Sequence, residues 1–170
     1  MTDATSDVRR TQPERRARSR TALLEAAARG MSRYGYAAVS LESIAQDAGY
    51  SRGALYHQFA GKEELAIAVV RWVEETWNTE VGWLLTAGGD PVQALLAVAR
   101  GHAVYCRRDV SRVLLTLRVE LGEREHPVGQ LITEVVGAVV DGCAQLVEAG
   151  RALEQHSPGP PRRTSPPPSW

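Results

Sequence analysis

Residues 40–59, SLESIAQDAGYSRGALYHQF, hold two helical patterns that are each too short to be stable alone, with a single glycine between them. Ser40 can cap the first helix, and Gly49 can end it. Apolar residues recur at helical spacing between these two points: Leu41, Ile44, Ala45 and Ala48. Ser51 can cap the second helix. Two short helices joined by so tight a turn predict a helix-turn-helix, whose second helix is presented to the major groove of DNA.

The second short helix is expected to bury one face and expose the other. Leu55 and Phe59 lie one turn apart and should point into a small core. At about 100° per residue, the residues expected on or beside the outer face are Arg52, Gly53, Ala54, Tyr56 and His57. Small residues let a backbone approach DNA closely, while Tyr, His and Arg side chains reach phosphates and base edges. The alternative is that these are ordinary surface residues of a helical bundle.

Helical spacing of apolar residues continues along the rest of the chain. Gly35 is a natural end for a first helix, and Asp90 followed by Pro91 is a natural start for a later one. The expected helices cover residues 14–34, 40–48, 51–59, 61–85, 91–106, 109–122 and 127–150. The last of them is apolar over most of its circumference and is expected to be largely buried. Because no strand-like alternation of useful length is present, the sequence predicts an all-α protein.

The charges are unevenly distributed although the net charge is zero. Residues 8–36 hold eight arginines against two glutamates, whereas residues 66–150 hold eleven acidic residues against seven arginines. A basic front of this kind points to a polyanionic partner. The arginines that could form an arm in the minor groove are Arg9, Arg10, Arg15, Arg16, Arg18 and Arg20. A merely solvated segment is the alternative.

The segment YGYAAVSLESIAQDAGYSRGALYHQFAGKEEL, residues 34–65, closely resembles the DNA-binding segment of the TetR family of bacterial transcriptional regulators. The resemblance includes the recognition helix GALYHQF and the sequence KEEL that opens the next helix. It implies an N-terminal three-helix helix-turn-helix DNA-binding domain, followed by a C-terminal helical ligand-binding and dimerisation domain. It also implies that Ser40 and Lys62 hold phosphates at helix starts. The further DNA contacts that it implies are those of Ser51, Arg52, Gly53, Ala54, Tyr56 and His57.

Four parts of the chain are expected from these patterns. They are a disordered basic arm (residues 1–13), the helix-turn-helix domain (14–62), a helical regulatory domain (63–150) and a Pro-rich disordered tail (151–170). The tail contains SPGPPRRTSPPPSW, with six prolines in fourteen residues, which cannot form a packed helix. Since members of the family usually extend further, the regulatory domain is expected to be truncated.

The function implied by the resemblance is that of a ligand-responsive repressor. Such a protein binds a pseudo-palindromic operator in double-stranded DNA as a homodimer, because one head contacts only one half-site. An unknown small-molecule effector would then release the DNA. The alternative is a truncated member with impaired dimerisation, which acts as a weak monomeric DNA binder or as a subunit of a heterodimer.

The candidate residues for the effector pocket lie on three expected helices of the regulatory domain. They are Trp72, Trp83, His102, Tyr105, Cys106 and Arg118. His102 and Cys106 are one helical turn apart, a spacing that could hold a metal ion. A place in the core or in the pocket lining is favoured over a metal site, and no cofactor is expected.

Several other classes of protein are not favoured by the sequence. It shows no nucleophile elbow, phosphate loop or cluster of metal ligands, so an enzyme is not expected. No window approaches the roughly 20 uninterrupted apolar residues of a membrane span, so a cytoplasmic protein without a membrane partner is expected. Cys106 and Cys143 lie within apolar helical patterns and are expected to be reduced, buried thiols.

Overall fold

The computed structural model describes residues 11–108, 111–122 and 125–156. Every regular element within these ranges is a helix, which confirms the predicted all-α fold. The elements are α1 (Gln12–Ala38), α2 (Leu41–Asp47), α3 (Arg52–Tyr56), α4 (Lys62–Glu80), the 3₁₀ helix η1 (Gly82–Leu85), α5 (Pro91–Tyr105), α6 (Arg112–Leu121) and α7 (Pro127–His156). Gly49 and Pro91 mark element boundaries as expected, whereas Gly35, the expected end of the first helix, lies at a kink within α1, which continues to Ala38.

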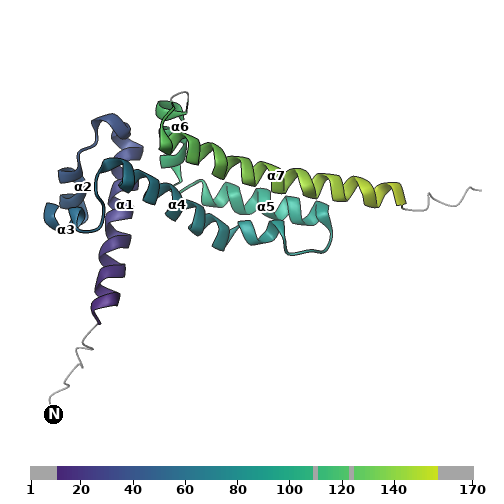
Figure 1. Ribbon diagram of the computed structural model, residues 1–170. Coiled ribbons are helices and arrows are strands. Elements are labelled where there is room, and N and C mark those ends of the chain that lie inside the picture. The colour runs from purple at the N-terminus through teal and green to yellow at the C-terminus, as the bar shows by residue number, and fades with distance from the viewer. Residues whose placement is uncertain (1–10, 109–110, 123–124, 157–170) are drawn as a thin grey trace, which may run out of the picture.

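The helices form a head and an elongated body (Figure 1). In the head, α2 packs on both α1 and α3, and the first turns of α1 project beyond the other helices. In the body, α5 and α7 lie side by side, and α4 runs from the head into the body. Helix α6 packs against α1 as well as α7, so it joins the two parts.

The first helix begins two residues earlier than the sequence predicted. The backbone N–H of Thr11 donates to Oε2 of Glu14 at 2.9 Å, and Pro13 lies in the first turn. Both features stabilise a helix start, because one side chain satisfies a backbone donor and proline needs none. Arg15 and Arg20 are therefore on an exposed helix rather than on an extended arm. The predicted arm residues Arg9 and Arg10 lie outside the described residues.

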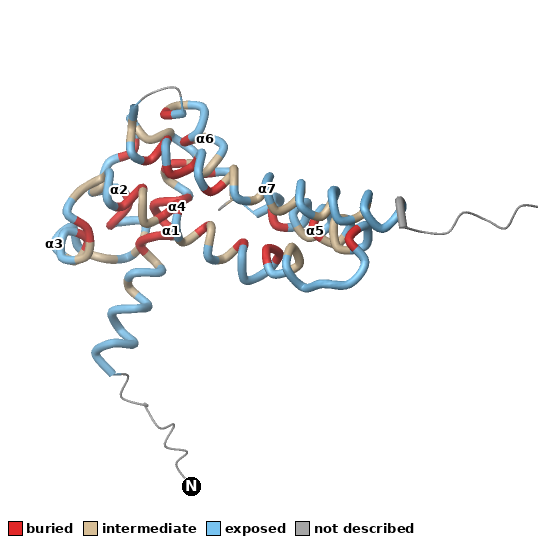
Figure 2. Tube along the Cα trace, turned by 45° about the vertical axis from the view of Figure 1, so that its right-hand side comes forward, coloured by how far each residue is buried: buried red, intermediate tan, exposed pale blue. Residues whose placement is uncertain are grey.

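Burial is concentrated where the head meets the body (Figure 2). The largest fully buried side chains of the core include those of Phe59, Leu23, Met31, Ile44, Leu55, Leu65 and Leu117. Burial of a side chain such as Phe59 or Leu55 stabilises the fold by roughly 1.5–3 kcal/mol. The two short helices α2 and α3 thus depend on a core that α1 and α4 share with them.

The expectation that the last helix is largely buried is wrong. Among the described residues of α7, the buried apolar side chains end at Val135, while Val140 and Leu153 are each 59% exposed. The apolar composition of α7 was correctly recognised, but its far half packs only along one side, against α5 and η1. Pro127–Glu154 is long and apolar enough to cross a membrane by length and composition. In the structure this helix packs against α4, α5 and α6.

The end of α7 lies beyond the predicted boundary at residue 150. The helix continues to His156. The remaining residues of the expected Pro-rich tail, 157–170, lie outside the described residues.

Candidate nucleic-acid interface and regulatory cavity

The turn between α2 and α3 is fixed by Gly49. Its φ of 75° lies in the left-handed region that favours glycine. The N–H of Tyr50 donates to the carbonyl oxygen of Ala45 at 2.9 Å, and that of Gly49 donates to the carbonyl oxygen of Gln46 at 3.0 Å. These two bonds form a Schellman motif, which satisfies carbonyl groups at the end of α2. The turn therefore sets the angle between α2 and α3.

Helix α3 presents the face that the sequence predicted. Ser51 caps it by accepting the N–H of Ala54 at 3.2 Å, and Leu55 and Phe59 are buried. The predicted contact residues that are exposed together on α3 and its ends are Ser51, Arg52, Gly53, Tyr56 and His57, while Ala54 is half-buried. The structure thus brings together a set of small, aromatic and basic side chains of the kind that contacts DNA.

Arg52 and Tyr56 form a pair on this face. The Arg52 guanidinium carbon lies 5.4 Å from the centre of the Tyr56 ring. A hydrogen bond to the Tyr56 hydroxyl raises the pKa of Arg52 above its ordinary value. Both side chains are exposed, so the pair is accessible to a phosphate or a base edge.

The two residues expected at phosphates are placed differently from each other. Ser40 is exposed and caps α2 by accepting the N–H of Ser43 at 3.1 Å. Lys62 is half-buried, and its Nζ donates to the carbonyl oxygens of Tyr36 at 2.9 Å, Ala37 at 3.1 Å and Val39 at 2.9 Å. An ammonium group has three donors, so these carbonyls can use all of them. In the structure, Lys62 caps the C-terminal end of α1.

The head also contains contacts that sequence reasoning missed. Nε2 of Gln58 donates to Oγ of Ser19 at 2.9 Å, which ties the end of α3 to α1. The guanidinium of Arg20 lies 4.7 Å from the centre of the Phe59 ring. These contacts join residues about 40 positions apart. No local pattern signals them, because periodicity and caps report only on neighbours within a helix.

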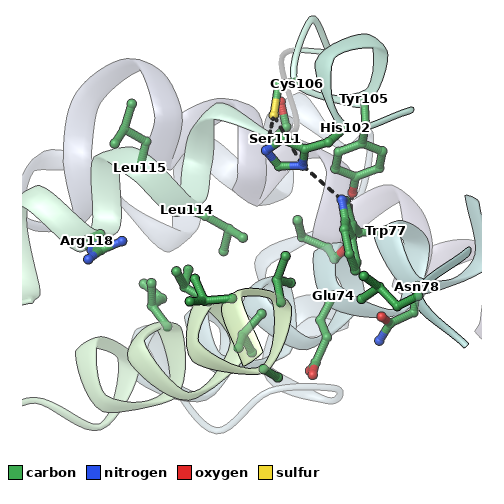
Figure 3. Close-up of a pocket in the computed structure, with 18 residues that line it drawn as sticks. Glu74, Trp77, Asn78, His102, Tyr105, Cys106, Ser111, Leu114, Leu115 and Arg118 are labelled. Carbon is green, nitrogen blue, oxygen red and sulfur yellow. Dashed lines mark hydrogen bonds between the residues drawn. The ribbon is translucent and has the colours of Figure 1, made fainter. Parts of the chain in front are cut away.

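A cavity of about 430 Å³ lies between α4, α5, α6 and α7 (Figure 3). Its volume is within the range of about 300–1,000 Å³ that is usual for small-molecule sites. Four of the six predicted pocket residues line it: His102, Tyr105, Cys106 and Arg118. Trp72 and Trp83 are absent from the lining, and Trp77 contributes the indole instead. Trp72 packs partly buried against the core, and Trp83 is 56% exposed.

Trp77, His102 and Cys106 form a chain of contacts on the cavity wall (Figure 3). Nε1 of Trp77 donates to Nδ1 of His102 at 3.0 Å, and Nε2 of His102 lies 3.3 Å from Sγ of Cys106. An indole N–H can only donate, so Nδ1 must accept and the neutral ring carries its proton on Nε2.

This tautomer limits the chemistry of the pair. A metal ion bound between Nε2 and Sγ would need the lone pair of Nε2, and an imidazolium beside a thiolate would need a proton on Nδ1. Both conflict with the bond from Trp77. Burial on the cavity side raises the pKa of the Cys106 thiol, which also keeps it protonated. The arrangement therefore fits a wall of a binding cavity rather than a nucleophilic or metal-binding centre.

The expectation of two buried thiols is wrong in part. Both cysteines are free, but Cys106 is an exposed residue overall and Cys143 is half-buried. The apolar pattern around them correctly located helices, yet it did not determine which positions lie at the cavity mouth.

Tyr105 is a structural residue of the same wall. It is 4% exposed, and its hydroxyl donates to the carbonyl oxygen of Val73 at 3.0 Å. Burial, with a smaller contribution from Glu80, raises the pKa of Tyr105 to about 12. The neutral phenol therefore joins α5 to α4 beside the cavity.

A cluster at the junction of head and body links the cavity helices to α1. The carboxylate of Glu120 in α6 accepts the N–H groups of Tyr36 at 2.6 Å and Ala37 at 2.8 Å. These groups follow Gly35, where α1 is kinked with φ of 83°. The Tyr36 ring packs edge-on against His126, just before α7, with ring centres 5.2 Å apart. Sequence reasoning missed Glu120, since its partners are more than 80 positions away.

Comparison with known proteins agrees with this geometry. The family model for bacterial regulatory proteins, tetR family, matches residues 23–69. The uncharacterized HTH-type transcriptional regulator YxaF of Bacillus subtilis (strain 168) is 36% identical over 78 residues, 45% of this chain and 41% of that protein. The HTH-type transcriptional regulator LmrA of the same organism is 34% identical over 80 residues, 46% of this chain and 43% of that protein. These matches span less than half the length of either relative.

Solved structures extend the likeness to the fold of the body. AibR, in complex with isovaleryl coenzyme A and operator DNA, superposes with a TM-score of 0.69 at 22% identity, over 82% of this chain and 76% of that chain. SCO4454, a TetR-family transcriptional regulator from Streptomyces coelicolor, superposes with a TM-score of 0.68 at 24% identity, over 82% of this chain and 79% of that chain. Because the family model matches residues 23–69, the helix-turn-helix segment of this chain belongs to the tetR family of bacterial regulatory proteins, and the body shares the fold of these solved structures.

Proposed function

We propose that the protein is a transcriptional repressor that binds operator DNA through α3 and releases it when a small molecule occupies the cavity. The observation that carries the proposal is the joint exposure of Arg52, Gly53, Tyr56 and His57 on a helix held by the turn at Gly49. Support comes from the relatives YxaF and LmrA, which are described as HTH-type transcriptional regulators. AibR, which shares the fold, was solved with operator DNA and isovaleryl coenzyme A together.

The proposed active form is a homodimer on a pseudo-palindromic operator. Helix α3 has only five residues and reads one half-site, so tight binding needs two heads at a fixed spacing. The proposal includes a cytoplasmic location and no catalytic activity. A monomeric DNA binder is not favoured, and sedimentation at micromolar concentration tests this directly. A single species of monomer mass, both free and on DNA, would contradict the dimer.

The proposed route from cavity to DNA runs through α6. This helix lines the cavity with Leu114, Leu115 and Arg118, and it holds the kinked end of α1 through Glu120. A ligand that prefers one position of α6 would shift the equilibrium between head positions by the difference in its affinity for them. The head need not contact the ligand, because α1 packs on both α2 and α6.

The direct experiment is a titration of the purified chain into labelled DNA from upstream of its own gene. Fluorescence anisotropy is read at several salt concentrations, with a shuffled duplex of equal length as the control. We expect tighter binding to the upstream duplex and affinity that falls steeply with added salt, since contacts to phosphates release counterions. Equal affinity for the two duplexes would contradict specific operator binding at this locus.

A further inference from the structure

We infer that the cavity binds a mostly apolar molecule carrying an anionic group, and that Arg118 holds the anion. This inference rests on the proposed function only in treating the cavity as the effector site. It is carried by the chemistry of the cavity wall and by the charges that remain unpaired there.

The side of the cavity formed by α6 and α7 is largely apolar. Helix α7 contributes Val135, Val136, Val139 and Val140, and α6 contributes Leu114 and Leu115. Such a surface gains about 25 cal/mol for each Å² that a ligand removes from water. It offers a hydrocarbon body many contacts and no hydrogen-bond partner. The body of the ligand should therefore be apolar.

Arg118 is the cation left unpaired on this wall. Its side chain is exposed at the cavity, and its guanidinium makes no hydrogen bond or ion pair with any residue that the structure describes. The carboxylate on the wall, Glu74, is instead paired, because Nη1 of Arg71 donates to its Oε2 at 3.0 Å. The charge available to a ligand is therefore positive. A guanidinium offers two parallel N–H groups, which match a carboxylate or a phosphate.

The other polar groups of the wall do not favour a cationic ligand. The hydroxyl of Tyr105 donates to Val73, and that of Ser111 donates to the carbonyl oxygen of Arg108 at 2.8 Å. The bond from Trp77 makes His102 present an N–H rather than a lone pair. The guanidinium of Arg118 is thus the charged group that the wall leaves for a ligand beside an apolar space, and a ligand with an apolar body and anionic oxygen atoms fits both features.

The test compares decanoate with 1-decanol, which share the hydrocarbon body and differ in the anion. Binding to the full chain is measured by calorimetry, and quenching of Trp77 in the wall provides a second reading. We expect decanoate to bind about tenfold more tightly than decanol, the factor expected for one charge-assisted contact at a partly open site. In Arg118→Met the preference should disappear, while Arg118→Lys should retain part of it.

A matched control is Arg100→Met, which removes an exposed arginine of α5 that does not line the cavity. It should leave the preference for decanoate intact. Thermal unfolding of each variant checks the fold, and little change is expected because Arg118 is exposed. Decanoyl coenzyme A distinguishes the source of the anion. Tighter binding than decanoate, lost in Arg118→Met, would place a phosphate rather than a carboxylate at this residue.

Equal binding of decanoate and decanol, or a preference that survives Arg118→Met, would overturn the inference. The result can be separated from the proposed function by adding the DNA titration. Arg118-dependent binding that leaves DNA affinity unchanged would support the cavity chemistry and contradict the ligand response. Release of DNA by decanol and decanoate alike would support the ligand response and contradict the role of Arg118.

Discussion

The carboxylate of Glu120 holds the backbone N–H of Tyr36 at 2.6 Å, so a helix of the cavity wall is bonded directly to the kink of α1. Its other oxygen accepts the N–H of Ala37 at 2.8 Å. On the opposite side of the same turn, Lys62 donates to the carbonyl oxygens of Tyr36 and Ala37. One carboxylate and one ammonium group thus bind the donors and acceptors of this turn, the first from α6 and the second from the start of α4.

Glu120→Gln tests this bond. The amide keeps one acceptor oxygen but loses the other and the negative charge, so one backbone N–H group is left without its partner. We expect the free energy of unfolding to fall by about 1–3 kcal/mol. Urea denaturation measures this, and Glu148→Gln, at an exposed position of α7, is the control. Equal midpoints for the two variants would show that the bond contributes nothing to stability.

Gly35 and Gly49 give a second prediction, because both have positive φ but differ in surroundings. A Cβ at Gly49 would meet nothing within 4 Å, whereas one at Gly35 would lie 2.8 Å from Oε2 of Glu120. Gly49→Ala should therefore cost only backbone strain, about 1–2 kcal/mol. Gly35→Ala should cost more, since it also displaces the carboxylate. Thermal unfolding measures both, and Glu120→Ala should recover part of the extra loss in the Gly35 variant. The idea fails if Gly49→Ala is the more damaging change.

The head could be predicted from sequence because its signals are local. Gly49, Ser51 and Leu55 act on neighbours within a few positions, and each has the role that its residue type favours. Glu120 and Lys62 could not be placed in this way. Their partners are backbone groups 84 and 26 positions away, and no side-chain pattern records the position of a backbone N–H or C=O.

In the body, the sequence predicted the helices but not which of their faces are buried. Helix α4 is apolar on two sides, so the sequence could not decide which of its tryptophans reaches the cavity, and Trp77 rather than Trp72 does so. The apolar pattern of α7 likewise does not indicate which helices pack against its second half. Periodicity reports which residues share a face of a helix, while burial depends on what packs against that face.

The α3 face gives a third prediction. Tyr56→Ala and His57→Ala should each weaken binding to operator DNA by about 1–3 kcal/mol if they contact base edges. Tyr34→Ala is the matched control, because Tyr34 is 62% exposed on α1 and lies outside this face. Anisotropy titrations at fixed salt compare the variants. Unchanged affinity for both α3 variants would remove these residues from the proposed contacts.

The contacts of Trp77 predict how Cys106 reacts. Because burial raises its pKa, the thiol should be alkylated by iodoacetamide at pH 8 more slowly than free cysteine. Trp77→Phe removes the donor to Nδ1 of His102, so the ring can carry its proton on Nδ1 and accept the S–H of Cys106 at Nε2. Alkylation of Cys106 should then be faster. Peptide mapping separates Cys106 from Cys143, and a second change, His102→Ala, should cancel the increase. A rate that is the same with and without Trp77 would contradict the proposed tautomer.

Gln58 gives the last prediction, because its amide is only half satisfied. Nε2 donates to Ser19, while the buried Oε1 has no hydrogen-bond partner among the described residues. An unpaired buried oxygen costs about 1–3 kcal/mol, whereas the bond that Nε2 makes contributes about 1 kcal/mol. Gln58→Met preserves the length of the side chain and removes both polar groups. The hydroxyl of Ser19 keeps its bond to the carbonyl oxygen of Arg16 at 2.9 Å.

We therefore expect Gln58→Met to raise the free energy of unfolding, by up to about 1 kcal/mol, as measured by urea denaturation. Gln58→Ala is the companion variant, and it should lower stability because it leaves space beside Phe59 and Leu55. If the methionine variant is less stable than the wild type, the oxygen has a partner in solution, such as an ordered water molecule. The amide would then stabilise the packing of α3 on α1 through both of its ends, and its role in orienting the DNA-binding face would be larger than one hydrogen bond to Ser19 suggests.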